Sequence, residues 1–501
     1  MEKSLPHLPF KKDIDAIFAD LTALFRVFQD AWGSVTVRSG KDGNTCGLLE
    51  MMQASLGRPL FNLMVTDCLK EAVPFDKEDI SEFERVLGLA KALEKQLRQM
   101  GLLSSDTKHL EEFAADIDSL FMTRRCQKFL ADARDLIMSD VHESELVGVR
   151  QKSEEEEEEE FLRNVQEFGL IPTRQAKEWK KEVRVQTLRR LPPNFHFPRC
   201  RVSKSTLAFV RLLESCVAEA TTATSASSVA RLLQLSRMML ELFLHLSPTH
   251  HESTLHLLPQ TAGLFYNDCF YVAHRLITLG WELTPAVAPK LGLSTEELQI
   301  SYADIIPQLT QLATDQLEQT LTAKKEEILT MLKEAEGFVN VSEKKTVDAP
   351  KVLKGCVLRL EQLSRVWREV MTETTLFKSM GAITECLLRE ICRQILALED
   401  ISADDTAVLS KALNSTLESL EKLFQTKDKN TLIHEYCDYA EYQRLKEVTA
   451  CLDASMQEIV ERWARGKGPL AAHLTASQLK QLIRALFQNT DRRAKALASI
   501  T

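Results

Sequence analysis

The spacing of apolar side chains predicts helices along nearly the whole chain. Between residues 14 and 28 an apolar residue recurs every three or four positions, which places all of them on one helical face. This stripe consists of Ile14, Ile17, Phe18, Leu21, Leu24, Phe25 and Phe28. The same period predicts further helices over 48–70, 81–100 and 106–139. Short connections between successive helices are typical of antiparallel neighbours in a bundle.

The helical period resumes at Ser203 and continues to the C-terminus. Pro248 is expected to end one of these helices. The apolar stripes keep no long heptad register and show no fixed repeat, so bundled or stacked helices are expected rather than a long coiled coil. The predicted helices cover 203–220, 229–246, 255–280, 294–335, 351–371, 377–398, 402–424, 444–463 and 474–501.

Two short motifs have the spacing of a capping box, which marks the start of a helix. They are Thr475 with Gln478, and Ser294 with Glu297. Each is flanked by leucines that can form a hydrophobic staple across it. A glycine-rich break at 466–468 separates the last two predicted helices. The end of the chain is therefore expected to be a helix, an elbow and a terminal helix.

The composition changes sharply after residue 143. Seven consecutive glutamates occupy 154–160, and a basic stretch at 174–190 follows before a proline pair. A block of like charge repels itself and usually stays unfolded. The predicted domains are an N-terminal helical bundle over 10–143, a charged and disordered linker over 144–201, a middle bundle over 202–340 and a C-terminal bundle over 350–501.

The totals favour an all-α fold of elongated, stacked helical bundles. Only 17 glycines and 15 prolines occur in 501 residues, and long helices need few turns. A formal net charge of −9 argues against a general binder of nucleic acid or membrane surfaces. No apolar run approaches the roughly 20 residues of a membrane span. The eleven scattered cysteines, without a CxxC pair or a signal peptide, are expected to be reduced and buried in the cytosol.

The histidines are the only candidates for a catalytic metal site. Four of them fall within twelve residues: His245, His250, His251 and His256. No HExxH pattern orders them, and adding Cys269 as a ligand needs a fold that the sequence does not indicate. The chain also lacks GxSxG, P-loop and GxGxxG motifs. We therefore expect no catalytic residue, metal or cofactor. A metal-dependent enzyme around these histidines remains an alternative.

The C-terminal segment is locally basic, although the protein is acidic. Residues 461–501 carry only Glu461 and Asp491 as acids. The cations are candidates for binding an acidic partner, although a solvated helix face explains them as well. Together with 174–190 they also leave a helical nucleic-acid-binding module as an alternative. The candidate partner-binding residues are Arg462, Arg465, Lys467, Lys480, Arg484, Arg492, Arg493 and Lys495.

Several segments resemble the Zeste White Ten family of kinetochore and vesicle-tethering proteins. The segments GKGPLAA at 466–472 and LIRALFQNTDRRAKALASI at 482–500 are similar to the end of that family. The segment PQTAGLFYNDCFYVAHRLITLG at 259–280 is a close match. Further likeness lies around Arg124-Arg125-Cys126, around Met380-Gly381 and at 397–402. It covers nearly all of 10–143 and 200–501.

The resemblance implies a non-enzymatic helical subunit of two assemblies. One, with Rod and Zwilch, recruits dynein–dynactin at the kinetochore and supports the spindle checkpoint. The other, with NAG and Rint, tethers Golgi-derived vesicles at the endoplasmic reticulum, whose SNAREs it reaches indirectly. Dynamitin, a dynactin subunit, is a further implied partner. The implied locations are the cytoplasm, the mitotic kinetochore and the cytoplasmic face of the endoplasmic reticulum, with membranes reached only through protein docking.

This sequence departs from the family in two places. Family members begin with a long coiled-coil region that contacts partner subunits, whereas the likeness here starts near the middle of such a protein. We therefore expect either a shortened form of such a protein or an incomplete sequence, and in either case the contacts to Rint and Zwilch are the ones affected. The glutamate run at 154–160 is the second departure.

Overall fold

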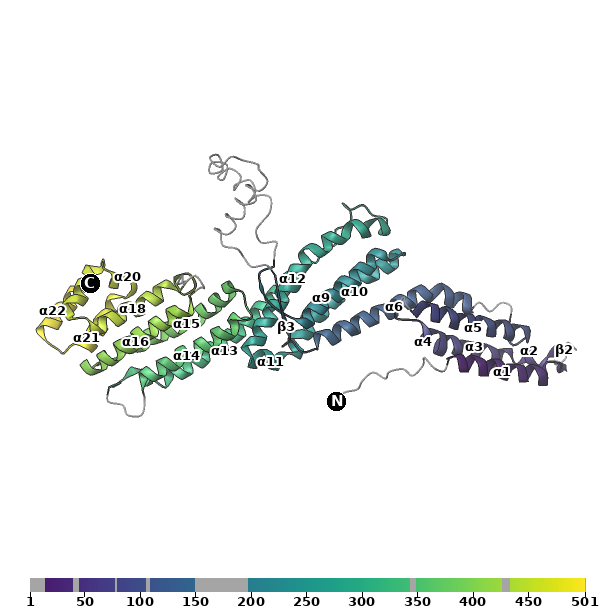
Figure 1. Cartoon of the computed structure of the whole chain (residues 1–501), viewed down its shortest axis with the longest axis horizontal. Helices are drawn as coiled ribbons and strands as arrows, with labels where there is room; N and C mark the ends of the chain where they lie inside the picture. The colour runs from purple at the N-terminus through teal and green to yellow at the C-terminus, as the bar shows by residue number, and fades with distance from the viewer. Residues whose placement is uncertain are drawn as a thin grey trace, which may run out of the picture. The chain divides into compact units, whose positions relative to one another are not determined.

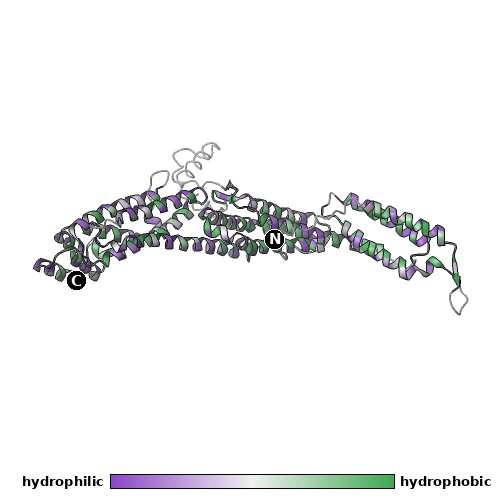
Figure 2. Ribbon diagram, turned by 90° about the horizontal axis from the view of Figure 1, so that it is seen from below, coloured by the Kyte–Doolittle hydropathy of each residue, from purple (hydrophilic) through white to green (hydrophobic). Residues whose placement is uncertain are grey.

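A computed structural model describes residues 14–38, 45–76, 79–104, 109–148, 197–342, 348–425 and 433–500. Helices dominate these residues (Figure 1), so the all-α prediction is confirmed. Hydrophobic and hydrophilic residues occur side by side on the same helices (Figure 2), as expected for helices that bury one face. The glutamate run at 154–160 and the basic stretch at 174–190 lie outside the described residues.

The chain forms two compact units. The first comprises Met1–Asp135, Leu212–Glu241 and Leu283–Gln299, and the second comprises Leu136–Arg211, Leu242–Glu282 and Ile300–Thr501. Each boundary except the one near residue 299 falls inside a helix. The domain limits that composition suggests, at 143, 201 and 340, remain predictions.

The first unit begins with three long helices and a broken one. The long helices are α1 (Ile14–Trp32), α5 (Ile80–Gln99) and α6 (His109–Ile137). The helix predicted over 48–70 is interrupted by π-helical turns, which leaves α2 (Leu48–Met51), α3 (Arg58–Leu63) and α4 (Lys70–Ala72). Strands β1 (Thr36–Arg38) and β2 (Thr45–Gly47) pair as a short hairpin before them. The core of this unit is aromatic and aliphatic, and includes Phe18, Phe25, Phe61, Phe83 and Leu97.

Four further helices follow the segment predicted as a linker. They are α9 (Lys204–Thr222), α10 (Ala226–His250), α11 (Glu252–Leu257) and α12 (Pro259–Val287). The two ends of the linker segment pair antiparallel, as β3 (Ser144–Val147) and β4 (Cys200–Ser203). The prediction that Pro248 ends a helix is wrong, because α10 continues through it to His250. Pro259 instead starts α12, where a missing N–H costs nothing.

The capping box at Ser294 forms but does not open the predicted helix. The Ser294 N–H donates to Glu297 Oε2 at 2.9 Å, and the Glu297 N–H donates to Ser294 Oγ at 3.3 Å. The residues that follow form a turn, and α13 begins only at Ile306 and runs to Lys333. Pro307 lies in the first turn of α13.

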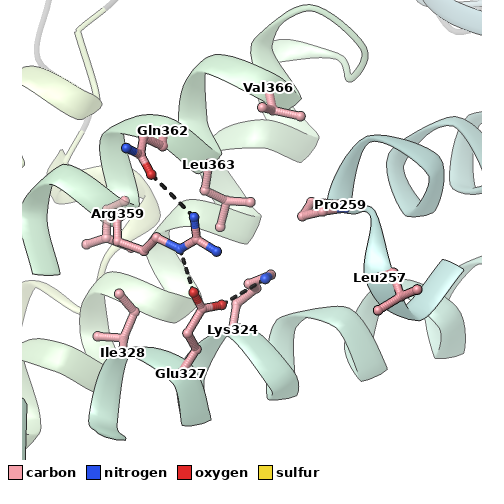
Figure 3. A pocket seen from close by; sticks show the side chains of 10 residues that line it. Leu257, Pro259, Lys324, Glu327, Ile328, Arg359, Gln362, Leu363 and Val366 are labelled. Atoms are coloured by element: carbon pink, nitrogen blue, oxygen red, sulfur yellow. Dashed lines mark hydrogen bonds and ion pairs between the residues drawn. The ribbon is translucent and has the colours of Figure 1, made fainter. Parts of the chain in front are cut away.

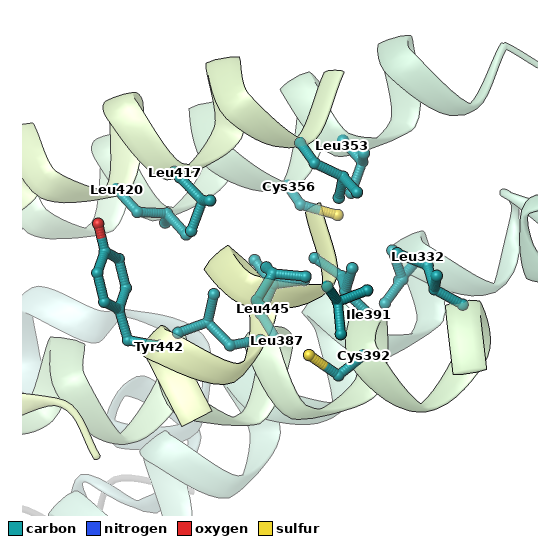
Figure 4. Close-up of a cluster of buried hydrophobic side chains, with 14 of the residues drawn as sticks. Leu332, Leu353, Cys356, Leu387, Ile391, Cys392, Leu417, Leu420, Tyr442 and Leu445 are labelled. Carbon is teal, nitrogen blue, oxygen red and sulfur yellow. The ribbon is translucent and has the colours of Figure 1, made fainter. Parts of the chain in front are cut away.

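The C-terminal part of the second unit is a helical bundle around one large core. Its long helices are α13, α14 (Ala349–Arg368), α15 (Glu373–Leu396), α16 (Ala403–Leu423) and α18 (Tyr439–Asp453), with the short α17 (Ile433–Tyr436) between the last two. They run side by side in Figure 1. Figure 4 shows the leucines that these helices turn toward one another, together with Cys356, Cys392 and Tyr442.

The end of the chain has more helices than predicted. The single helix expected over 444–463 is wrong, because Ser455 starts a new helix, α19 (Met456–Trp463), with its own capping box to Glu458. The terminal helix expected from Leu474 is also two helices, α21 (Ala476–Leu486) and α22 (Asp491–Ser499), and the short α20 (Pro469–His473) precedes them.

Two further findings concern cysteines and membranes. The ten cysteines whose side chains the structure describes are free thiols, and seven of them are buried. Burial raises the pKa of most of these thiols, which keeps them protonated and unreactive; the pKa of Cys392, for example, is about 12. In the part of the chain that the structure describes, no helix has the length and apolar character to cross a membrane.

Candidate partner-binding surface

Arg462, the first of the eight candidate cations, is bound within the chain. It lies at the end of α19, and its guanidinium forms a bidentate ion pair with Glu447 of α18, at 2.6 and 2.7 Å from Nη2 and 3.2 Å from Nε. Glu447 is only 8% exposed, so it needs this partner. Hydrogen bonding to Glu447 raises the pKa of Arg462. Arg462 therefore ties two helices together, while its side chain stays 43% exposed.

Arg465 and Lys467 lie on the turn that follows α19, and both are exposed. Ala464, Arg465 and Gly466 have positive φ angles of 46°, 55° and 80°, so the chain reverses sharply here. A Cβ at Gly468 would lie 1.9 Å from the carbonyl oxygen of Arg462, so only glycine fits at that position. The turn presents its two cations on a tightly built elbow.

Lys480 and Arg484 share one face of α21, because four residues separate them. Arg484 is exposed and Lys480 is half-buried, while Leu479, Leu482 and Ile483 are buried on the opposite side. The predicted capping box holds the start of this helix: the Gln478 N–H donates to Thr475 Oγ1 at 3.3 Å, and the Thr475 N–H donates to Gln478 Oε1 at 3.0 Å.

Helix α22 carries the last three cations. Arg492 and Lys495 are exposed, whereas Arg493 is half-buried. The Nη1 of Arg493 donates to the carbonyl oxygens of Phe487, at 2.7 Å, and of Arg484, at 3.2 Å. These carbonyls lie at the end of α21, where a cation is favourable to the helix dipole. Arg493 thus fastens α22 to α21.

The structure therefore divides the eight candidates into two classes. Arg462 and Arg493 serve the fold. The side chains of the other six make no hydrogen bond or ion pair with any residue that the structure describes. These six, which we call the free cations, are Arg465, Lys467, Lys480, Arg484, Arg492 and Lys495. They lie on the elbow after α19, on α21 and on α22, helices that pack against one another through α19–α22 and α21–α22 contacts.

The histidine cluster does not form a shared site. His251 is buried, and its Nε2–H donates to the carbonyl oxygen of Ile137 at 2.9 Å. Burial lowers the pKa of His251 despite this bond, so the imidazole is held neutral. His245 and His250 lie on α10 and His256 on α11. Among the described residues, no three His, Cys, Asp or Glu side chains come together as metal ligands would.

Sequence reasoning missed a buried polar cluster at the start of α9. Asp268 of α12 is 1% exposed and accepts hydrogen bonds from the Ser203 N–H, at 2.8 Å, and from Ser203 Oγ, at 2.7 Å. Burial raises the pKa of Asp268 to about 7. The neighbouring Asn267 donates to the carbonyl oxygens of Arg201, at 2.9 Å, and Val370, at 3.0 Å. Asn267 and Asp268 thus join β4, α9, α12 and the end of α14.

The only signal for this cluster in the sequence is the adjacent Asn-Asp pair inside an apolar stretch. Polar residues in a buried helix face call for partners within the chain. Their partners lie 65 and more residues away. The sequence therefore gives no means of naming them.

Three family models match successive parts of the chain, and all three describe the same protein. The model of the centromere/kinetochore protein zw10 middle domain matches residues 9–137. The zw10 C-terminal model matches 195–330. The model of the zw10 C-terminal helical domain matches 351–500.

Full-length relatives agree with the models. The chain is 31% identical to the mouse (Mus musculus) centromere/kinetochore protein zw10 homolog, over 90% of this chain and 58% of the mouse protein. It is 26% identical to the Caenorhabditis elegans homolog and 22% identical to the Arabidopsis thaliana homolog, over 90% and 87% of this chain. These matches cover 60% and 54% of those two proteins, so the chain spans little more than half the length of its relatives.

One solved structure has a more distant likeness. The C-terminal domain of the exocyst subunit Sec6p superposes with a TM-score of 0.37 and 12% sequence identity, over 70% of this chain and 93% of that domain. The assignment rests on the sequence models and on the relatives. All three models occur in order and together account for most of the residues. The chain therefore belongs to the family of the centromere/kinetochore protein zw10.

Proposed function

We propose that this chain is a non-enzymatic scaffold subunit that binds other proteins through exposed helix surfaces. The observation that carries the proposal is the ordered match to three zw10 models, because the relatives so named are kinetochore proteins. The free cations support the same reading. Four of them lie on the short, capped helices α21 and α22 and two on the turn after α19, and their positive charge is not used inside the described fold.

The proposed assemblies are the two of the zw10 family. At the mitotic kinetochore the chain would join Rod and Zwilch and help to recruit dynein–dynactin, through dynamitin, for the spindle checkpoint. In interphase it would join NAG and Rint at the cytoplasmic face of the endoplasmic reticulum, receive Golgi-derived vesicles and reach SNAREs through its partners. The chain spans just over half the length of its relatives. We therefore propose each of these contacts for this chain separately.

The proposed mechanism is to hold bound partners, without chemistry on any of them. Exposed cations steer an acidic surface into register and speed association, while buried apolar contacts supply most of the affinity. The free cations fit the first role. Two of them, Lys480 and Arg484, lie on α21, whose opposite face is fixed in the core by Leu479, Leu482 and Ile483, so their charges are presented on a rigid support.

Affinity purification of the 501-residue chain from mitotic and interphase cells, followed by mass spectrometry, tests the proposal. Recovery of Rod and Zwilch from mitotic cells, and of NAG and Rint from interphase cells, is the expected result. Recovery of dynactin components alone would limit the chain to motor recruitment. Recovery of none of these proteins would contradict the proposed scaffold function.

A further inference from the structure

A pocket of about 180 Å³ lies between the beginning of α12 and helices α13 and α14 (Figure 3). Its walls are mainly apolar. Ile328 and Leu363 are buried in them, whereas Leu257 at the end of α11 is 75% exposed and Val366 of α14 is 39% exposed. A mainly apolar pocket with a few polar groups on its wall is the usual form of a binding site. The volume suits one large side chain.

One wall of the pocket is charged. Glu327 of α13 accepts hydrogen bonds from Arg359 Nε of α14, at 2.5 Å, and from Lys324 Nζ, at 2.8 Å. Arg359 Nη1 also donates to Gln362 Oε1 at 3.3 Å. Burial would raise the pKa of Glu327, but the hydrogen bonds from Lys324 and Arg359 outweigh it and hold the pKa below its usual value. Glu327 is therefore ionised at neutral pH.

Two cations share a single carboxylate here, so the wall carries a net charge of about +1 at neutral pH. Arg359 Nη2 makes no hydrogen bond within the described parts of the chain. The guanidinium lies across the pocket from Pro259 and Leu257 (Figure 3). An incoming carboxylate could take this nitrogen as its donor and leave Glu327 in place.

The opposite walls are held at a fixed separation. Trp367 of α14 is buried, and its Nε1–H donates to the carbonyl oxygen of Pro259 at 2.9 Å. This bond ties the end of α14 to the start of α12, so the pocket is already formed without a ligand. A preformed pocket loses little conformational entropy on binding.

We propose that this pocket, which we call the Arg359 pocket, binds a segment of a partner protein that inserts a bulky apolar side chain beside an Asp or Glu carboxylate. The apolar walls match the side chain, and the spare positive charge matches the carboxylate. A small inorganic anion would leave most of the apolar surface exposed. The Arg359 pocket is separate in sequence from the free cations, and its test does not depend on the assemblies proposed above.

The test begins with a displayed library of random 16-residue peptides, selected against the full 501-residue chain. Enriched peptides should place Phe, Trp or Leu within four residues of Asp or Glu. Synthetic copies are then titrated into the wild-type protein and its variants by fluorescence anisotropy. Arg359→Gln and Leu257→Ser should each weaken binding about tenfold, from loss of the charged hydrogen bond and of the apolar rim respectively.

A third variant separates binding from a structural role. Glu327→Gln removes the acid that the two cations share, so an acidic peptide should bind several-fold more tightly. If Arg359 only holds α13 to α14, Glu327→Gln should weaken binding as Arg359→Gln does. Arg389→Gln is the matched control, because Arg389 is another half-exposed arginine in ion pairs, on α15 outside the pocket. It should leave the affinity unchanged.

Three results would overturn the proposal. They are a library that yields no enriched peptide, enriched peptides without an acidic residue, and peptides whose affinity is the same for the wild type, Arg359→Gln and Leu257→Ser. Thermal unfolding of each variant, measured in parallel, shows whether a loss of binding reflects a loss of folding. Leu257→Ser is important here, because a side chain that is 75% exposed contributes little to the core.

Discussion

Two sets of polar side chains in the second unit have opposite surroundings. Asn267 and Asp268 are buried and find their partners inside the chain, at positions far away in sequence. The free cations are mostly exposed and find none among the described residues. Buried polar groups without partners are costly, whereas exposed cations cost almost nothing. The first set therefore serves the fold, and the second is the set that we propose for binding.

Removing Asp268 should have the largest effect on stability. Asp268→Ala leaves the Ser203 N–H and hydroxyl without their acceptor and opens a small cavity, so the free energy of unfolding should fall by about 3 kcal/mol. Urea denaturation followed by tryptophan fluorescence measures it. Asp400→Ala is the control, because Asp400 is exposed, and its effect should stay within about 0.5 kcal/mol. Equal effects of the two variants would contradict the importance of the buried cluster.

The pH dependence of stability should identify the same carboxyl group. Its pKa is about 7 in the folded protein, raised by burial from a usual value of 3.8. A raised pKa stabilises the folded state at low pH, and this contribution is lost as the pH rises toward 7. Between pH 5 and pH 7.5 the wild type should lose about 2.5 kcal/mol more than Asp268→Asn, which cannot ionise. Parallel pH profiles for the two proteins would show that Asp268 does not titrate in this range.

Two glycines in the C-terminal bundle should respond in opposite directions when each is replaced by alanine, with smaller changes in stability than at Asp268. A Cβ at Gly381 would lie 1.9 Å from the carbonyl oxygen of Tyr436, so Gly381→Ala should destabilise the protein by about 2 kcal/mol. At Gly355 the nearest atom is the flexible end of Met331, at 3.6 Å. Gly355→Ala should therefore be neutral or stabilise by up to about 1 kcal/mol. Thermal melting of both variants tests the pair, and the reverse order would refute this packing.

Charge reversal of free cations should have the smallest effect on stability. Lys480→Glu combined with Arg484→Glu should change the free energy of unfolding by less than about 0.5 kcal/mol, because neither side chain has an internal partner among the described residues. Arg462→Ala should cost about 1 kcal/mol, since Glu447 loses its ion pair. Urea denaturation distinguishes them. A larger loss in the double variant than in Arg462→Ala would place the free cations in the fold.

Local signals in the sequence were sufficient to predict the position of most helices and of the capping box that starts α21. The apolar period predicts α1, α5, α14, α15 and α16 to within a few residues. The Thr475–Gln478 box lies where the spacing places it. These features depend on residues that are near neighbours in the chain, which is why they can be predicted.

The sequence did not reveal breaks between helices where the apolar stripe continues in register across the break. The apolar stripe from Leu445 to Ile459 continues in register through the break at Ala454, so it gives no sign that α18 ends and α19 begins. The Ser455–Glu458 capping box was the available signal. Pro248 was misleading in the other direction, because α10 continues for two residues past it, to His250.

The division of the eight candidate cations could not be predicted at all. Arg462 differs from Arg484 only in having Glu447 across a helix break, 15 residues away. Arg493 is fixed by backbone carbonyls that are available only because α21 ends at Leu486. Both contacts depend on how helices pack, which composition and spacing do not encode.

The most direct test of the central claim compares partner recovery by the wild type and the Lys480→Glu, Arg484→Glu double variant. Both proteins would be purified from isotope-labelled mitotic cells, and the ratio of each co-purified protein would be measured by mass spectrometry. We predict that Rod and Zwilch co-purify with the wild type and that their recovered amounts fall at least several-fold with the double variant, while the thermal stability of the chain stays the same. Equal recovery with both proteins would contradict a role for these free cations in binding, and recovery of neither subunit with the wild type would contradict the scaffold function.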